Sequence, residues 1–212
     1  AGMEGSGQGQ ILRALAGIVR PSGGHIYMRK EENQKVDLVG RHYFDFKEAG
    51  ISFLPAARLE EGLIAGLNLN EHFILAEKQS GFFIDQKSAQ KLTEHRIKDF
   101  NIKGTPEINI ESLSGGNQQR AELALLRQPL RLLLLDHPTR GLDIESSMYI
   151  WNKMKQRCKE GASIIFISSD LDEVLQYSDR ILVFFGGKVS SPFDASKVTV
   201  DELGQLIGGK GW

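Results

Sequence analysis

Two stretches in the second half of the chain decide the fold. Residues 113–120 read Leu-Ser-Gly-Gly-Asn-Gln-Gln-Arg, and residues 132–143 read Leu-Leu-Leu-Leu-Asp-His-Pro-Thr-Arg-Gly-Leu-Asp. The first stretch precedes a helical pattern. The hydroxyl of Ser114 and the main-chain N–H groups after it therefore lie at a helix N-terminus, where the helix dipole favours an anion; an ordinary turn and helix cap is the alternative. The second stretch contains four leucines without alternation, which predicts a strand buried on both faces and ending at Asp136.

Further apolar runs place this strand in a sheet. Residues 164–167 and 181–185 are also continuous apolar runs, and residues 51–54 read as a buried strand that ends at a proline. Strands of this kind, separated by helices, favour an α/β fold with a mostly parallel core sheet, and residues 70–128 are helical in pattern. The predicted strands are 25–28, 51–54, 132–135, 164–167 and 181–185, and the predicted helices outside 70–128 are 11–19, 144–159 and 200–207.

The first ten residues, Ala-Gly-Met-Glu-Gly-Ser-Gly-Gln-Gly-Gln, form a glycine-rich opening to a helix. They keep the glycine spacing of a phosphate-binding P-loop, in which main-chain N–H groups surround the phosphates. The lysine of that pattern is replaced by Gln8, and its serine or threonine by Gly9. Such a loop normally follows a strand, so we expect the first strands of the core to precede residue 1; a flexible chain end is the alternative reading.

Composition excludes several classes of protein. The chain has 212 residues, 26 Lys and Arg against 27 Asp and Glu, a net charge of −1 and one cysteine. A protein that binds nucleic acid through a basic field needs an excess of Lys and Arg, so we expect no nucleic-acid partner. A single cysteine forms no disulfide framework or zinc cluster, which favours a reducing compartment. No apolar run approaches the roughly 18 residues of a membrane span.

The two stretches, in this order and spacing, resemble the ATP-binding cassette (ABC) family. Leu-Ser-Gly-Gly is similar to the family signature, the leucine run ending at Asp136 to the Walker B strand, and Gly141-Leu142-Asp143 to the D-loop. The variants Leu-Ser-Gly-Gly-Asn-Gln-Gln and Pro-Thr-Arg-Gly resemble the simple-sugar and nucleoside importers, whose ATPase polypeptide carries two cassettes in tandem. A P-loop with Gly-Gln in place of Gly-Lys is similar to their second, C-terminal cassette.

The resemblance implies a division into three parts. Residues 1–69 would hold the P-loop and Q-loop part of the core, residues 70–128 a helical subdomain with the signature, and residues 129–212 the Walker B, D-loop and switch part. Phe82 and Phe83 fall where the family contacts its permease, although core packing is the favoured reading. Trp151 is predicted to be a core residue.

The resemblance also implies ATP and Mg²⁺ as cofactors, with Asp136 as the metal residue. The implied partners are a second cassette, integral membrane permease subunits and, indirectly, an extracytoplasmic solute-binding protein. The implied location is peripheral, at the cytoplasmic face of the inner (plasma) membrane. The residues expected to bind ATP, here or on the opposing cassette, are Gly2, Gly5, Ser6, Gly7, Gln8, Gly9, Gln10, Ser114, Gly115, Gly116, Asn117, Gln118 and Asp143.

Departures from the family pattern affect the catalytic positions. His137 stands where the family has the glutamate that activates water, Ser169 where it has the switch histidine, and Ala56 where these relatives have a Q-loop glutamate. A neutral imidazole has no fixed charge to orient water. We therefore expect Asp136, His137 and Ser169 to form a degenerate catalytic site, while the signature half stays intact. Two alternatives are a non-catalytic cassette partner and a soluble cassette ATPase acting on ribosomes or DNA.

Overall fold

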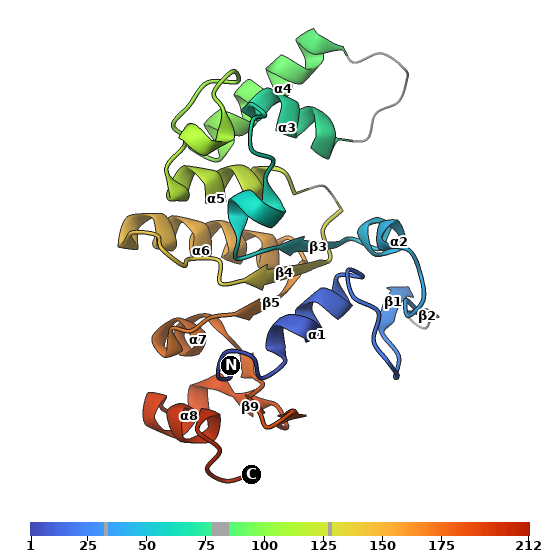
Figure 1. The fold of residues 1–212 in the computed structure, drawn as a ribbon, viewed down its shortest axis with the longest axis vertical. Coiled ribbons are helices and arrows are strands. Elements are labelled where there is room, and N and C mark those ends of the chain that lie inside the picture. Colours follow the sequence, from blue (N-terminus) through green and yellow to red (C-terminus); the bar gives the residue numbers. More distant parts are fainter. Residues whose placement is uncertain (32–33, 78–84, 127–128) are drawn as a thin grey trace. The chain divides into compact units, whose positions relative to one another are not determined.

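The computed structural model describes residues 1–31, 34–77, 85–126 and 129–212 (Figure 1). The chain divides into two compact units. The first unit comprises residues 1–53, 132–137 and 164–212, and the second comprises residues 54–131 and 138–163. Phe82 and Phe83 lie outside the described residues.

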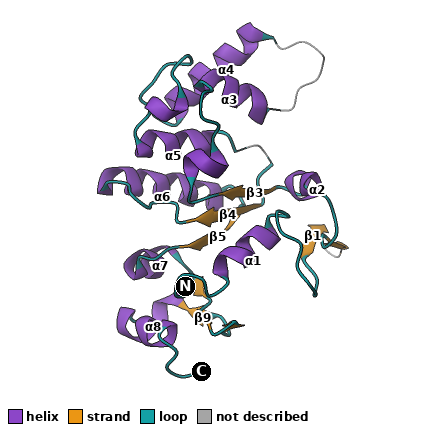
Figure 2. Cartoon of the chain, viewed as in Figure 1, coloured by secondary structure: helices purple, strands orange, loops and turns teal. Residues whose placement is uncertain are grey.

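A three-stranded sheet lies at the centre of the first unit. Its strands are β3 (Ile51–Leu54), β4 (Leu132–Asp136) and β5 (Ser163–Ile167), in the order β3-β4-β5, and they lie side by side in Figure 2. The N–H of Leu132, at the start of β4, donates to Gly50, just before β3. The N–H of His137, just after β4, donates to Ile167, at the end of β5. The start of β4 therefore bonds next to the start of β3, and the end of β4 bonds next to the end of β5. The strands are parallel, as predicted.

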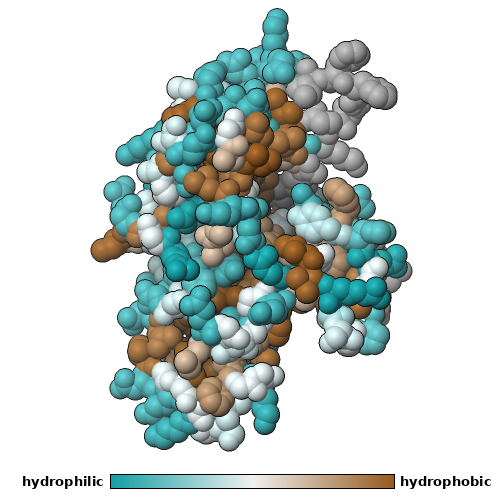
Figure 3. Space-filling view, in the orientation of Figure 1, coloured by the Kyte–Doolittle hydropathy of each residue, from teal (hydrophilic) through white to brown (hydrophobic). Residues whose placement is uncertain are grey.

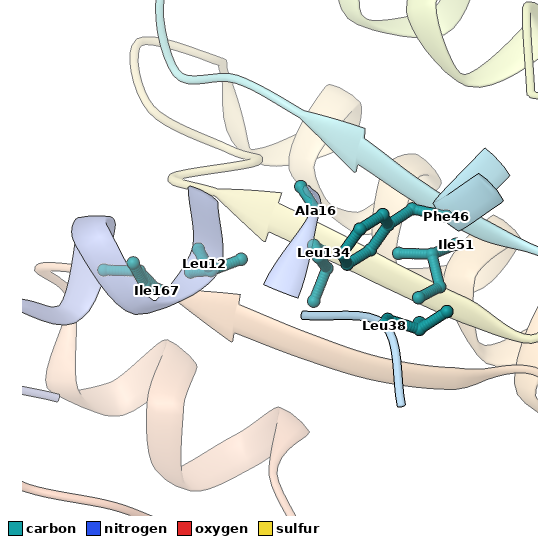
Figure 4. Packing of buried hydrophobic residues seen from close by; sticks show 7 residues of the cluster. All are labelled: Leu12, Ala16, Leu38, Phe46, Ile51, Leu134 and Ile167. Carbon is teal, nitrogen blue, oxygen red and sulfur yellow. The ribbon is translucent and has the colours of Figure 1, made fainter. Parts of the chain in front are cut away.

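The core of this unit forms where the first helix, α1 (Gln8–Leu15), packs on β4. Leu12 on α1 and Leu134 on β4 are both buried, and Phe46 of α2 (Tyr43–Glu48) lies in the same cluster. Figure 4 shows the cluster, which consists of Leu12, Ala16, Leu38, Phe46, Ile51, Leu134 and Ile167. The apolar face of α1 thus covers the sheet and fixes the start of the helix, and with it the glycine-rich loop.

The strand predicted at residues 25–28 is displaced and has a partner that the sequence did not indicate. β1 (Tyr27–Glu31) pairs antiparallel with β2 (Gln34–Asp37), although polar residues occupy most of both strands. Tyr27 lies opposite Asp37. Main-chain pairing between neighbouring segments therefore forms this hairpin without an apolar run.

The prediction of a single strand at residues 181–185 is wrong. The segment divides into β6 (Arg180–Ile181), paired with β9 (Phe193–Asp194), and β7 (Phe184–Phe185), paired with β8 (Lys188–Val189). Between them the main chain of Leu182 and Phe184 bonds to Ala1, and Gly2 forms a parallel bridge with Phe184. The segment changes its pairing partner twice within five residues, which breaks the strand.

Two helices complete the C-terminal part of the first unit. These are α7 (Leu171–Tyr177) and α8 (Val200–Ile207), with a short 3₁₀ turn at Ala195–Lys197 between them in the sequence. The boundaries of α8 agree with the prediction. Thr199 caps α8 by accepting from the N–H of Glu202, while the carboxylate of Glu202 accepts from the N–H of Thr199. This reciprocal capping box explains why the helix begins where it does.

The regular structure described in the second unit consists mainly of helices, as the sequence predicted for residues 70–128, with an isolated antiparallel bridge between Asn68 and Asn109. A π-helical turn at Arg58–Gly62 comes first. The helices after it are α3 (Leu69–Ala76), α4 (Gln86–Asp99), the 3₁₀ turn Ile110–Ser112, α5 (Gly115–Ala124) and α6 (Ile144–Lys159). Trp151 is 4% exposed, which confirms that it is a core residue.

The surface carries separate hydrophobic side chains among hydrophilic ones, and Figure 3 shows this mixture on one face. Among the large apolar side chains that the structure describes, Ile144 and Phe44 are the most exposed, at 82% and 73%. Across the described ranges, none of the helices combines the length and the hydropathy that crossing a membrane requires.

Candidate nucleotide site

The glycine-rich loop turns directly into α1. Gly7 occupies the N-cap position with φ 109°, and no side chain caps the helix, so the first N–H groups of α1 point out of the helix end. Gly9 and Gln10 lie in the first turn. The N–H of Ser6 donates to the carbonyl of Met3, which closes the loop. The loop therefore has the main-chain arrangement of an anion cradle.

Gln8 does not take the place of a phosphate-binding lysine in this structure. Its amide Nε2 donates to the carbonyl of Met3 at 2.8 Å and to that of Gly2 at 3.3 Å. Its Oε1 is buried and has no hydrogen-bond partner. The side chain folds back and braces the loop, and it adds no positive charge to the cradle.

Asp136, His137 and Ser169 lie together in the first unit. The Nδ1 atom of His137 is 2.7 Å from Oδ1 of Asp136, and its Nε2 atom is 2.9 Å from Oγ of Ser169. β4 ends at Asp136 and β5 ends at Ile167, so the parallel register brings the residues that follow both strands to one edge of the sheet. His137 has a φ of 49°, an uncommon backbone conformation for a residue other than glycine. The structure thus brings the three predicted catalytic residues into one hydrogen-bonded chain.

The contacts with Asp136 and Ser169 hold the imidazole ring of His137 in one orientation. When Nδ1–H donates to the carboxylate of Asp136, Nε2 carries the lone pair and accepts the hydroxyl proton of Ser169. Both ring nitrogens then have partners within the protein. The ring is mostly buried, with its side chain 22% exposed, whereas Ser169 is exposed.

For Mg²⁺, the donor set is small. In the parts of the chain that the structure describes, no group of three or more His, Cys, Asp or Glu residues is arranged to hold a metal ion. Gly9 supplies no hydroxyl, and one oxygen of Asp136 is bonded to His137. The residues present fit Mg²⁺ only as an ion bound mainly by phosphate and water, with Asp136 as its protein contact.

The signature stretch lies in the second unit. Ser114 is exposed at the N-cap of α5, and its Oγ accepts from Nδ2 of Asn117 at 2.9 Å. The Oδ1 atom of Asn117 accepts from the N–H of Lys103 at 2.8 Å, which holds the amide in one orientation. Gln118 is buried and donates to the carbonyl of Leu113. The hydroxyl of Ser114 and the glycine N–H groups at the start of α5 are thereby held at the surface.

The D-loop residue Asp143 is the N-cap of α6. Its carboxylate accepts from the N–H of Ser146 at 2.8 Å and from the Ser146 hydroxyl at 2.9 Å. These hydrogen bonds, the main-chain one first, hold the pKa of Asp143 below its ordinary value. A Cβ atom on Gly116 would lie 2.8 Å from Oγ of Ser146, so α5 and α6 begin side by side and only glycine fits at this contact. Ser114 and Asp143 therefore cap two helices of the second unit, α5 and α6, whose first turns are in contact.

The sequence motifs do not indicate a set of contacts that lie next to the start of α5. Ala56, at the Q-loop position, is half-buried, and the contacts come instead from Arg58, two residues further along. Arg58 donates to Oε1 of Gln119 at 3.0 Å and to the carbonyl of Arg140 at 3.3 Å. Gln119 and Glu122 are each 2% exposed. The available signal was α5 itself, which carries polar residues on the side that a soluble helix normally buries.

A glycine loop that enters a helix, a carboxylate at the end of a buried parallel strand and a Ser-Gly-Gly helix start together define an ATP-binding cassette. A family model described as "ABC transporter" matches residues 1–140. The chain belongs to the ABC transporter family.

Relatives and solved structures agree with this assignment. The chain is 38% identical to the xylose import ATP-binding protein XylG of Photobacterium profundum, over 96% of this chain and 40% of that protein. It is 34% identical to the uncharacterized ABC transporter ATP-binding protein YphE of Escherichia coli (98% and 41%) and 32% identical to the ribose import ATP-binding protein RbsA of Streptococcus agalactiae (99% and 43%). The chain thus spans about two fifths of these relatives.

Among solved structures, the ATP-binding cassette MJ0796 in a dimeric post-hydrolysis state with ADP and phosphate has a TM-score of 0.73 and 21% identity, over 92% of this chain and 83% of that one. The ADP conformation of the cassette MJ1267 has a TM-score of 0.71 and 17% identity, over 99% and 82%. At these identities the likeness establishes the fold.

Proposed function

We propose that this chain is a nucleotide-binding domain of an importer for a sugar or a nucleoside. Its own Walker side binds ATP without hydrolysing it, and its signature side completes the site of a partner cassette. The observation that carries the first half is the hydrogen-bonded chain Asp136–His137–Ser169. Relatives at 32–38% identity that are named for xylose and ribose import support the transport role.

On the Walker side, the chain offers main-chain donors but little charge. The N–H group of Gly5 and those of residues 7–10, in the loop and the first turn of α1, would hold the phosphates. Asp136 would hold Mg²⁺ through water. The metal, when bound, neutralises phosphate charge. Because Gln8 is neutral and bonded to the loop itself, we expect weaker nucleotide binding than a lysine would give.

Hydrolysis needs a base that is free to orient and deprotonate water, and His137 is not free. Its Nε2 lies 2.9 Å from the hydroxyl of Ser169 and its Nδ1 lies 2.7 Å from the carboxylate of Asp136, so with the proton on Nδ1 both ring nitrogens have protein partners. Phosphoryl transfer depends almost entirely on positioning and charge stabilisation. Losing the lysine and the carboxylate base together is therefore expected to stop hydrolysis at this site.

On the signature side, by contrast, the groups that would bind phosphate lie at the surface, where they are available to a ligand. Ser114 is exposed and its hydroxyl is held by Asn117, next to the N–H groups at the start of α5. These groups would bind the γ-phosphate of ATP held by a second cassette. Closure of two such cassettes would move permease subunits at the cytoplasmic face of the plasma membrane, and a solute-binding protein outside would supply the solute.

A second candidate function is a cassette whose whole assembly hydrolyses nothing. The observation that favours it is Gln8, which braces the P-loop with its own amide and contributes no charge. In that case the chain would serve as a nucleotide-binding or structural partner.

ATP turnover of the full-length protein with its partners separates these functions. The variants are Ser114→Arg in the signature and Asp136→Ala in the Walker B strand, with Ser88→Arg on the exposed start of α4 as the matched control. We expect Ser114→Arg to abolish turnover, while Asp136→Ala and the control change it little. Equal damage from Asp136→Ala would show that the Walker side hydrolyses ATP. An inactive wild type would favour the second candidate.

A further inference from the structure

Arg58 connects three segments of the second unit that are far apart in the sequence. Its Nη1 donates to Oε1 of Gln119, on α5, at 3.0 Å. Both Nη1 and Nη2 approach the carbonyl of Arg140, at 3.3 and 3.4 Å. The Nη2 atom lies 3.3 Å from the position of a Cβ atom on Gly115, so the guanidinium lies against the main chain of the signature.

The orientation of Gln119 is set from its other side. Its Nε2 donates to Oε2 of Glu122 at 3.1 Å, which leaves Oε1 as the acceptor for Arg58. Because an amide has one acceptor oxygen and one donor nitrogen, these two partners determine which way it points. Glu122, Gln119, Arg58 and the carbonyl of Arg140 thus form one relay.

At one end of the relay lies the carboxyl group of Glu122, whose burial is unfavourable for folding. Glu122 is 2% exposed, and its Oε1 has no hydrogen-bond partner. It lies against Gly62, where a Cβ atom would clash with Oε1 of Glu122, so glycine is required there for the carboxyl to fit. A buried, half-bonded carboxyl is destabilising unless the remaining contacts compensate for it. We therefore look for the role of Glu122 in the side chain that it orients, which is that of Gln119.

We propose that Arg58 is a positioning residue for the signature half-site. Through Gln119 and its position beside Gly115 it holds α5, and through the carbonyl of Arg140 it holds the turn that leads to Asp143. It thereby fixes the exposed donors of Ser114 and of the glycines against the D-loop. This inference rests on the proposed function, because the donors act on nucleotide only when a second cassette closes on them.

A positioning role predicts a particular kinetic pattern. Nucleotide that reaches the partner cassette still binds, so the KM for ATP changes little. The closed arrangement of donors forms less well, so kcat falls; a displacement of about 1 Å can lower a rate by two orders of magnitude. A residue that only supports folding would lower the amount of active protein, and its variants would show a lowered melting temperature in proportion to the lost activity.

The test measures kcat and KM for ATP with the full-length protein and its partners. Arg58→Met and Gln119→Leu remove the two sides of one hydrogen bond, and Arg58→Lys keeps one donor. Arg157→Met is the matched control, since Arg157 pairs with Glu160 at the C-terminal end of α6. We expect Arg58→Met to lower kcat by about tenfold or more with KM within about threefold, and Arg58→Lys to be intermediate.

The double variant Arg58→Met with Gln119→Leu tests the relay itself. Because both changes break the same connection, its kcat should equal that of the more damaged single variant; multiplied losses would overturn the relay. Where Arg58→Met does not fold, Arg58→Lys and Gln119→Leu carry the same test. If Ser114→Arg abolishes turnover but Arg58→Met and Gln119→Leu keep wild-type kcat, the inference fails and the proposed function stands. If Ser114→Arg has no effect, both fail.

Discussion

The buried carboxyl of Glu122 makes the stability of the second unit depend on pH. Burial raises the pKa of Glu122 from 4.5 to about 8, although the guanidinium of Arg58 and the hydrogen bond from Gln119 lower it in part. The folded chain therefore holds this proton more tightly than the unfolded chain. The resulting stability is fully present below the unfolded pKa, and it is lost as the pH rises through the folded pKa.

The size of this effect follows from the two pKa values. Each unit of difference corresponds to about 1.4 kcal/mol, so the total loss from well below pH 4.5 to well above pH 8 amounts to about 5 kcal/mol, of which about 3 kcal/mol is lost by pH 7. Glu122→Gln keeps an acceptor for Gln119 and does not titrate. We expect its free energy of unfolding to exceed that of the wild type by an amount that grows with pH and levels off above pH 8.

Urea unfolding followed by the fluorescence of Trp151 measures this difference. Trp151 is buried on α6, in the same unit, and a Trp212→Phe background removes the second tryptophan. The difference should rise by about 1.4 kcal/mol per pH unit between pH 5 and pH 8. Glu94→Gln, an exposed glutamate on α4, is the matched control and should show no such trend. A difference between Glu122→Gln and wild type that stays constant with pH would contradict a raised pKa for Glu122.

Three further substitutions test the packing that holds the site. Gly116→Ala places a Cβ atom 2.8 Å from Oγ of Ser146 and should lower stability by about 1–3 kcal/mol, with partial recovery in the double variant with Ser146→Gly, as measured by urea unfolding. Leu134→Ala removes a fully buried side chain from β4 and should cost about 3–5 kcal/mol, whereas Leu182→Ala, at a position 42% exposed, should cost far less in the same assay. Thr199→Ala removes the cap of α8 and should cost about 1 kcal/mol; an unchanged midpoint would contradict the capping assignment.

The elements predicted correctly are those whose signal is local. The leucine run of β4 is a buried parallel strand, as predicted, whereas the apolar run of β5 forms a parallel strand in which Ile165 is 42% exposed. The helix predicted at 144–159 is confirmed, and the side chain of Asp143 caps it. In both cases, the residues that determine the element lie within it or next to it.

The errors lie where distant segments determine the structure. Nothing within residues 181–185 shows that Ile181 pairs with Phe193 while Leu182 and Phe184 bond to Ala1. The polar hairpin of β1 and β2 was missed for a related reason, since its main-chain pairing leaves no periodic apolar pattern to recognise.

The candidate site shows the same limit. The positions of Asp136, His137 and Ser169 follow from the motifs, but the hydrogen bond between His137 and Ser169 joins residues 32 apart and depends on the register of β4 against β5. The contact of Arg58 with Gln119 spans 61 residues. Such contacts depend on how helices and strands pack, which one sequence does not specify.

Under the proposed function, the Walker side of this chain holds ATP without cleaving it. The most direct measurement supplies a photoreactive ATP, labelled either at the α- or at the γ-phosphate, to the turning-over assembly and compares the two labels crosslinked to this cassette. If His137 is held between Asp136 and Ser169 as the structure shows, the γ-label and the α-label should be retained equally. Retention of the α-label alone would mean that ADP occupies the site, and hence that this cassette hydrolyses ATP.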